Sequence, residues 1–125
     1  MNKPIKIPGP DHPITITPSR DHVRVMLNGH AVADTKRALV LQEAAYKPVF
    51  YIPRTDAQMA LMEKTAHSTH CPYKGDASYY TIEAGDRVAE NAIWSYETPY
   101  PAMQEIAGHL AFYPDRVDAI EVTPA

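Results

Sequence analysis

The chain has a single cysteine, no long apolar run and no excess of basic residues, and each absence removes a class of protein. One cysteine among 125 residues, Cys71, excludes an internal disulfide, which fits a reducing compartment. No apolar run approaches the ~18 residues that a membrane-spanning helix requires. The formal net charge is −3 and the lysines and arginines are scattered, so the chain lacks the electrostatic footprint of a nucleic-acid-binding protein. We therefore expect a cytoplasmic protein whose partners include neither a membrane nor a nucleic acid.

Several catalytic and metal-binding motifs are also missing from the sequence. There is no Gly-x-Ser-x-Gly pattern of the kind that carries a hydrolase nucleophile, and the five glycines are too dispersed for a phosphate-binding loop. His67, His70 and Cys71 are three donors within a short stretch, but structural zinc sites commonly use two spaced pairs of ligands. Because the chain has no second cysteine, we expect no metal site, and the sequence assigns no cofactor.

The abundant residue types favour a β-rich fold. Twelve prolines and eight tyrosines favour many short strands and shaped loops over a helical bundle, and the length fits one domain with a real core. We predict an α+β, mainly β single domain over residues 14–125, with antiparallel strands in a curved or partly open barrel-like sheet and two short helices. Residues 1–13 hold four of the prolines and are expected to form a proline-rich N-terminal arm rather than a signal peptide.

The clearest local signal is a β-hairpin over residues 22–34. Apolar residues alternate with other residues up to Leu27, and Asn28-Gly29 then supplies the two-residue turn that most strongly indicates a hairpin. Further strands are predicted over the runs 14–16, 38–41, 49–52, 79–83, 87–96, 110–113 and 117–122. Asn91, near the middle of one of these strands, indicates a bulge.

Two helices are predicted between the strands. Residues 55–64 begin with a capping box that pairs Thr55 with Gln58, and a nearby Asp56 suits the positive end of a helix. Residues 101–107 begin with a proline, which fits a first helical turn, and Gly108 follows at the position of a C-terminal cap.

Candidate chemistry concentrates in residues 69–80. Pro72 disfavours a helical conformation at Cys71, and the turn after it places Gly75 where positive φ is tolerated. The thiol is therefore predicted where a loop passes into a strand. A nearby cation such as His70 or Lys74 would make the thiol reactive, whereas a small buried hydrophobe is the ordinary role of a free cysteine.

Aromatic residues near this stretch predict one wall of a small-molecule site. Trp94 and Tyr96 are two positions apart on a strand and so face the same side. Tyr73 and Tyr79 would add aromatic surface, of which ligand pockets are largely made. The same rings are equally consistent with an ordinary core.

Charged residues would complete the site. We expect Lys74 and Arg37 to bind an anionic group of an unidentified small molecule, with Cys71 or His70 as the reactive or orienting group. Arg37 and Glu43 could reach the same rim of the domain. Exposed charges are the default for such residues, so a solvated surface is the alternative interpretation for both.

Two other functions fit the same residues. A protein-interaction module would use Trp94 and Tyr96 as a recognition face, or a free sheet edge, and a homodimer would be one form of it. A thiol enzyme would need a base within hydrogen-bond reach of Cys71 and a third group that orients the base. The candidate bases are His67, His70 and His109. The small-molecule site is the leading interpretation.

The order and spacing of several motifs resemble a known family. The most specific block is the pentapeptide 71–75, Cys-Pro-Tyr-Lys-Gly. The other matching motifs are Ala77 with Tyr79-Tyr80, Asn28-Gly29 with Ala33-Asp34-Thr35, Tyr51-Ile52-Pro53 with Asp56, Trp94-Ser95-Tyr96 with Pro99, and Phe112-Tyr113. Over about residues 20–122, the chain resembles the domain of unknown function family 427.

This resemblance implies a small, mostly β domain of antiparallel strands with short helices. The family also carries a nucleotidyltransferase-like label. Nucleotidyl transfer requires clustered carboxylates for metal ions and a cradle for phosphates. The chain has no Gly-Ser turn followed by an Asp-x-Asp pair, so we do not expect that reaction.

Overall fold

The computed structural model describes residues 4–125, so residues 1–3 of the predicted arm lie outside the described part of the chain. The described chain is mainly β and all of its sheets are antiparallel. Its strands are β1 (Ile14–Pro18), β2 (His22–Leu27), β3 (His30–Thr35), β4 (Leu39–Glu43), β5 (Val49–Tyr51), β6 (Met62–Cys71), β7 (Gly75–Ala84), β8 (Arg87–Ser95), β9 (Ala111–Phe112) and β10 (Ala119–Thr123).

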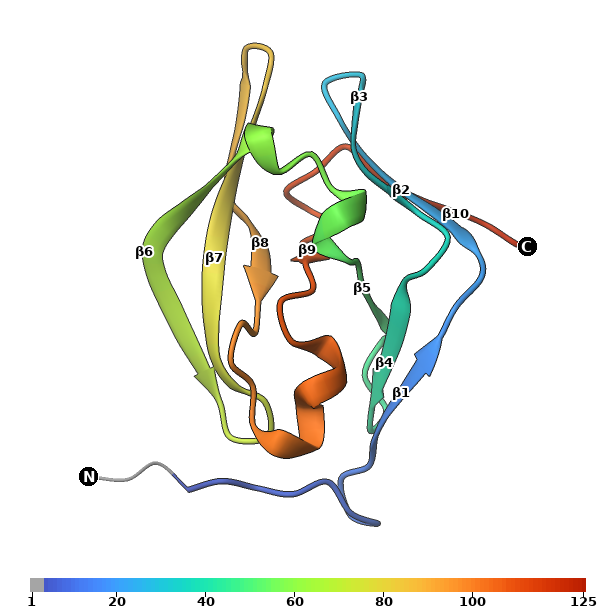
Figure 1. Cartoon of the computed structure of the whole chain (residues 1–125), viewed down its shortest axis with the longest axis vertical. Helices are drawn as coiled ribbons and strands as arrows, with labels where there is room; N and C mark the ends of the chain where they lie inside the picture. Colours follow the sequence, from blue (N-terminus) through green and yellow to red (C-terminus); the bar gives the residue numbers. More distant parts are fainter. Residues whose placement is uncertain (1–3) are drawn as a thin grey trace.

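The strands form three sheets whose orders are β1-β4-β5, β10-β2-β3 and β6-β7-β8-β9. Figure 1 shows the four-stranded sheet on one side of the molecule and the two smaller sheets on the other. The core lies between them, because buried side chains from both sides belong to common clusters. The two sides are also joined through the backbone, where Ile52 and Leu110 exchange two hydrogen bonds of 2.8 Å.

The hairpin prediction is confirmed. Strands β2 and β3 pair on either side of Asn28-Gly29, whose φ angles of 51° and 75° match the two positive angles of the favoured hairpin turn. The alternation within β2 places Val23, Val25 and Leu27 in the core with no exposed surface. A register shift between β7 and β8 and a φ of 49° at Asn91 confirm the predicted bulge.

The predicted helix over residues 55–64 is wrong. The segment forms two short 3-10 helices, η1 (Arg54–Asp56) and η2 (Met59–Leu61), and β6 begins immediately after them. Ala57 between them is extended and bridges to Ala33 of β3. Short helices are marginal unless packing stabilises them, and here pairing with β3 satisfies the backbone instead.

The other helix and the single-sheet prediction also need correction. Residues 101–106 form a kinked 3-10 helix, η3 (Pro101–Ile106), rather than an α-helix. The described strands form three separate sheets rather than one curved or barrel-like sheet.

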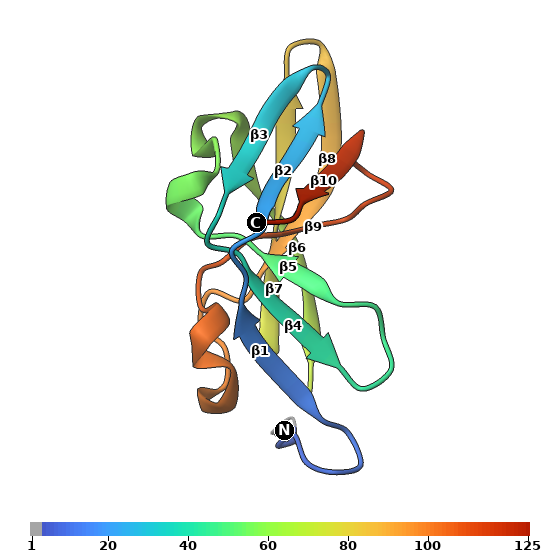
Figure 2. The same ribbon diagram turned by 90° about the vertical axis from the view of Figure 1, so that its right-hand side faces the viewer.

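Figure 2 shows the three 3-10 segments along one side of the molecule and β10 with the β4–β5 loop on the other. In residues 4–125, no helix is long and apolar enough to cross a membrane.

Two residues of β8 give a direct test of where the core lies. Ile93 has no exposed surface, whereas Val88 on the same strand is 62% exposed. We expect Ile93→Ala to lower the free energy of unfolding by about 2–5 kcal/mol, because it leaves a cavity in the core. The matched control Val88→Ala should change it by less than about 0.5 kcal/mol. Urea unfolding measures both, and equal losses would contradict the core described here.

Candidate functional site

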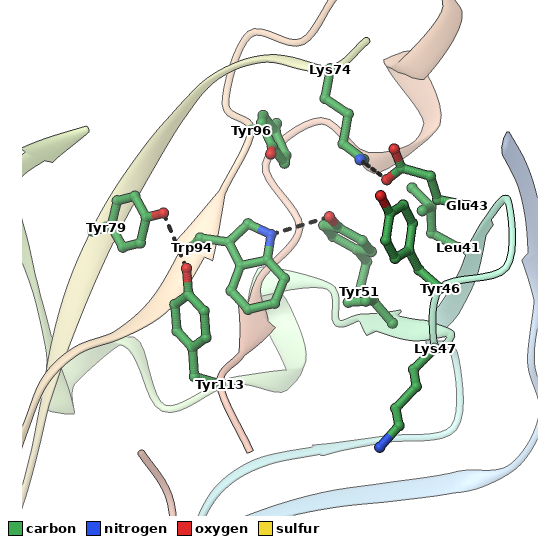
Figure 3. Close-up of a pocket in the computed structure, with 11 residues that line it drawn as sticks. Leu41, Glu43, Tyr46, Lys47, Tyr51, Lys74, Tyr79, Trp94, Tyr96 and Tyr113 are labelled. Atoms are coloured by element: carbon green, nitrogen blue, oxygen red, sulfur yellow. Dashed lines mark hydrogen bonds and ion pairs between the residues drawn. The ribbon is translucent and has the colours of Figure 1, made fainter. Parts of the chain in front are cut away.

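A cavity of about 220 Å³ lies where the four-stranded sheet meets β4 and β5. Six of its lining residues are aromatic and two carry opposite charges at one end (Figure 3). The lining residues are Leu41, Glu43, Tyr46, Lys47, Val49, Tyr51, Lys74, Tyr79, Trp94, Tyr96 and Tyr113. The cavity is therefore built by strands that are distant in sequence.

The turn between β6 and β7 directs Lys74 into this cavity. The Lys74 amide donates to the Cys71 carbonyl at 3.3 Å, and the Tyr100 amide donates to the Lys74 carbonyl at 3.0 Å. Gly75 follows with a φ of +110°, a conformation that residues with a Cβ rarely adopt. Held in this way, the Lys74 side chain is only 8% exposed. The sequence prediction of a turn ending at Gly75 is confirmed.

The buried ammonium of Lys74 is paired with Glu43 at the end of β4. Lys74 Nζ donates to Glu43 Oε1 at 2.5 Å, and Glu43 Oε2 lies 2.7 Å from His12 Nε2. Burial by itself raises the pKa of Glu43, but the hydrogen bonds from Lys74 and His12 outweigh it and lower that pKa below its ordinary value. Glu43 is therefore ionised at neutral pH, and one negative charge faces the Lys74 ammonium.

The aromatic walls carry hydroxyl groups that bond to one another. Trp94 Nε1 donates to the Tyr51 hydroxyl at 3.2 Å, and the hydroxyls of Tyr79 and Tyr113 lie 3.1 Å apart (Figure 3). Burial raises the pKa of Tyr51 and Tyr96 far above the ordinary phenol value and raises the pKa of Tyr113 to about 12. All three are neutral phenols at physiological pH, so they offer hydrogen bonds rather than charge.

Cys71 lies beside the charged end of the cavity. Its Sγ is 3.9 Å from Lys74 Nζ, and the residue packs against the core cluster that contains Tyr51 and Tyr96. The neighbouring His70 instead contacts Asp76 through Nδ1 at 2.7 Å. In the described chain, no histidine hydrogen-bonds the sulfur, so the structure brings Cys71 to Lys74 but not to His70.

The structure places two further candidate residues outside the cavity. Arg37 is 64% exposed and donates through Nη2 to Asp56 Oδ1 at 3.1 Å and to Thr55 at 2.9 Å. Tyr73 stacks on His12, with ring centroids 4.3 Å apart. Of the eight residues predicted from the sequence, the cavity lining gathers four: Lys74, Tyr79, Trp94 and Tyr96.

The described part of the N-terminal arm lies against the turn that carries Lys74. The Lys6 amide donates to the Pro72 carbonyl at 2.9 Å, and Lys6 Nζ lies 5.9 Å from the centroid of the Tyr73 ring. Together with the stacked His12, which also holds Glu43, these contacts fix the arm beside the cavity.

Sequence reasoning missed several lining residues and a second polar cluster. The sequence places Tyr51 and Tyr113 in strands and indicates no functional role for them, because alternation gives no sign that they contact Trp94. Glu97 is the centre of this second polar cluster. Its two carboxylate oxygens accept hydrogen bonds from Arg54 at 2.8 Å and from Lys64 at 2.7 Å. These contacts join segments far apart in the chain, which local patterns do not reveal. In residues 4–125, no three His, Cys, Asp or Glu side chains lie close enough to hold a metal ion.

The Glu97 cluster predicts a dependence of stability on pH. Partial burial raises the pKa of Glu97, but hydrogen bonds from Lys64, Tyr80 and Ser78 outweigh it and lower the pKa to about 2, from an ordinary 4.5. A carboxyl whose folded-state pKa is lowered stabilises the fold above its ordinary pKa, and this contribution is lost as the pH falls toward the folded-state pKa. We therefore expect the stability difference between wild type and Glu97→Gln to shrink between pH 4.5 and about 2.

The matched control for this measurement is Glu63→Gln. Glu63 is an exposed carboxylate on β6, so its substitution should leave the acid dependence close to that of the wild type. Chemical unfolding at a series of pH values gives both comparisons. A difference between wild type and Glu97→Gln that stays constant across the acid range would contradict the assignment.

The comparison with known families gives one result. Residues 15–123 match the family model described as "Domain of unknown function (DUF427)", and no curated protein matches the chain. The match runs from the second residue of β1 to the end of β10 and includes every strand that contributes to the cavity. The chain therefore belongs to the DUF427 family.

Proposed function

We propose that this protein binds a small molecule in the cavity between β4, β5 and the four-stranded sheet. The observation that carries the proposal is a lysine ammonium, 8% exposed, that lines a cavity whose other walls are mostly aromatic. Ligand sites in proteins are mainly apolar and aromatic with a few well-placed polar groups. This cavity has that composition, with Lys74 and Glu43 as the polar end.

Lys74 is the group we assign to the polar part of the ligand. An ammonium has three donors; one is used by Glu43, and the contact with Cys71 at 3.9 Å is long. A carboxylate or another strongly hydrogen-bond-accepting group of the ligand would take a remaining donor. Glu43 balances the charge of Lys74 in the absence of ligand, and His12 can hold Glu43 when the ligand shares the ammonium.

The aromatic residues would bind the body of the ligand. Trp94 and Tyr113 have ring centroids 4.5 Å apart, and Tyr79 stacks at 6.3 Å from Tyr113, so the three rings form one continuous wall. Rigid aromatic surfaces contribute contact area with little loss of conformational entropy. In this proposal Cys71 lies beside Lys74 without lining the cavity, and His70, paired with Asp76, takes no part.

The proposal is tested by binding of benzoate, which combines an aromatic ring with a carboxylate. Trp94 is the only tryptophan and lines the cavity, so its fluorescence reports on occupancy. We expect a saturable change in the wild type. Hydrogen bonds to charged groups contribute about 1.5–3 kcal/mol, so Lys74→Met should weaken binding by roughly tenfold or more.

Lys47→Met is the matched control. Lys47 also lines the cavity, but its ammonium points away from the other lining side chains in Figure 3, so this variant should bind benzoate like the wild type. Circular dichroism of each variant separates loss of binding from loss of fold. Equal affinity in the wild type and a folded Lys74→Met would refute the role of Lys74, and a Trp94 signal that never saturates would refute the site.

A further inference from the structure

A second hollow of about 350 Å³ lies next to the cavity and has a different chemistry. All ten of its lining residues are apolar: Val25, Pro48, Val49, Phe50, Ile52, Trp94, Phe112, Pro114, Ile120 and Val122. The hollow is open to solvent, since Val122 is 41% exposed and Pro48 and Pro114 are exposed as well. We call it the apolar groove. Apolar surface gathered in one concave place commonly marks a binding site.

The groove lies where an edge strand from each of the three sheets contributes to one surface. Strands β5, β9 and β10 are each the outermost strand of their sheets, and each contributes residues to the lining. Figure 2 shows β10, the β4–β5 loop and the chain that leads from β9 to β10 on the side away from the 3-10 segments. The groove is therefore accessible from the solvent on that side.

Strand β5 lies between the groove and the cavity that contains Lys74. Successive side chains on a strand point to opposite faces, and on β5 Tyr51 lines the cavity whereas Phe50 lines the groove. Two residues, Val49 and Trp94, line both hollows. The two hollows are therefore adjacent, and we call the boundary that these two side chains form between them the rim.

We propose that the ligand is amphipathic, with a polar head at Lys74 in the cavity and an unbranched alkyl tail in the apolar groove. The inference rests on the proposed function, because it assigns the head to the same cavity, and it adds the class of ligand. The ligand crosses the rim between Val49 and Trp94. The head accepts a hydrogen bond from Lys74, and the tail has no polar group because the groove offers no polar side chain as a partner.

The dimensions favour an alkyl tail over a protein partner. Specific protein interfaces bury at least about 1,000 Å², whereas the groove is a single hollow with ten lining residues. Its volume lies in the range of ~300–1,000 Å³ that is typical of small-molecule sites. The adjacent cavity contains a buried charge and shares two lining residues with the groove, which further favours one molecule that occupies both.

The test is a series of straight-chain carboxylates from butanoate to dodecanoate, each below its micelle concentration, with Trp94 fluorescence as the readout. Burial of each methylene should strengthen binding by about fourfold, until the groove is filled and the affinity levels off. Val122→Glu and, independently, Pro114→Glu place a charge at the solvent-exposed border of the groove, where both residues are exposed. Either variant should weaken dodecanoate binding by at least tenfold and leave benzoate binding unchanged.

Val88→Glu is the matched control, because Val88 is also an exposed valine and does not line the groove. It should bind every carboxylate like the wild type. If the affinity for the carboxylates does not depend on chain length, the tail assignment is overturned. If benzoate binding is still weakened by Lys74→Met in that case, the proposed function stands. Dodecanoate binding that is insensitive to Lys74→Met would overturn the placement of the head.

A third result would assign the groove to another occupant. If light scattering shows that the wild type is a dimer and that Val122→Glu is a monomer, the groove is an interface between copies of this chain and the tail assignment fails. A wild type that binds dodecanoate in a chain-length-dependent manner as a monomer supports the proposal.

Discussion

The ion pair between Lys74 and Glu43 is the contact on which the rest of the site depends. Lys74 comes from the turn of the four-stranded sheet and Glu43 from the end of β4 in a different sheet, so the pair links two sheets across the cavity. A buried charge that loses its partner is strongly destabilising. The position of β4 relative to the β6–β7 turn is therefore constrained by electrostatics, and His12 constrains it further by holding the second oxygen of Glu43.

Local chemistry predicted most of the strands, but it predicted the helices poorly and gave no strand over the residues of β6. The Asn28-Gly29 turn and the turn that ends at Gly75 depend on backbone angles that few residues adopt, so the sequence reveals them directly. The segment after Pro53 carries a capping box in its sequence, yet Ala57 pairs with Ala33 and Asp56 accepts a hydrogen bond from Thr35 at 2.7 Å. These tertiary contacts with β3 override a weak local preference.

The contrast between local sequence signals and tertiary contacts also explains which site residues could be predicted. Tyr79, Trp94 and Lys74 lie on one hairpin or in its adjoining turn. Alternation was enough to place Trp94 and Tyr96 on the same side, where both line the cavity. Tyr51 and Glu43 face them from another sheet, and the register between two sheets that share no ladder leaves no periodic signal in the sequence. Arg37 is the converse case: its charge suggested an anion-binding group or a solvated surface residue, and in the structure its guanidinium pairs with Asp56 outside the cavity.

Strand β5 lies between two hollows of different chemistry, the cavity that contains Lys74 and the apolar groove. On this strand of only three residues, Tyr51 lines the cavity that contains Lys74, Phe50 lines the apolar groove, and Val49 lines both. Trp94 suits the shared rim, since its indole ring is apolar and its N–H is already satisfied by Tyr51. A ligand that crosses this rim therefore meets aromatic surface rather than an unsatisfied polar group. A site of the kind we propose would select ligands by where polarity changes along their length, and the distance between Lys74 and the indole of Trp94 would set that position.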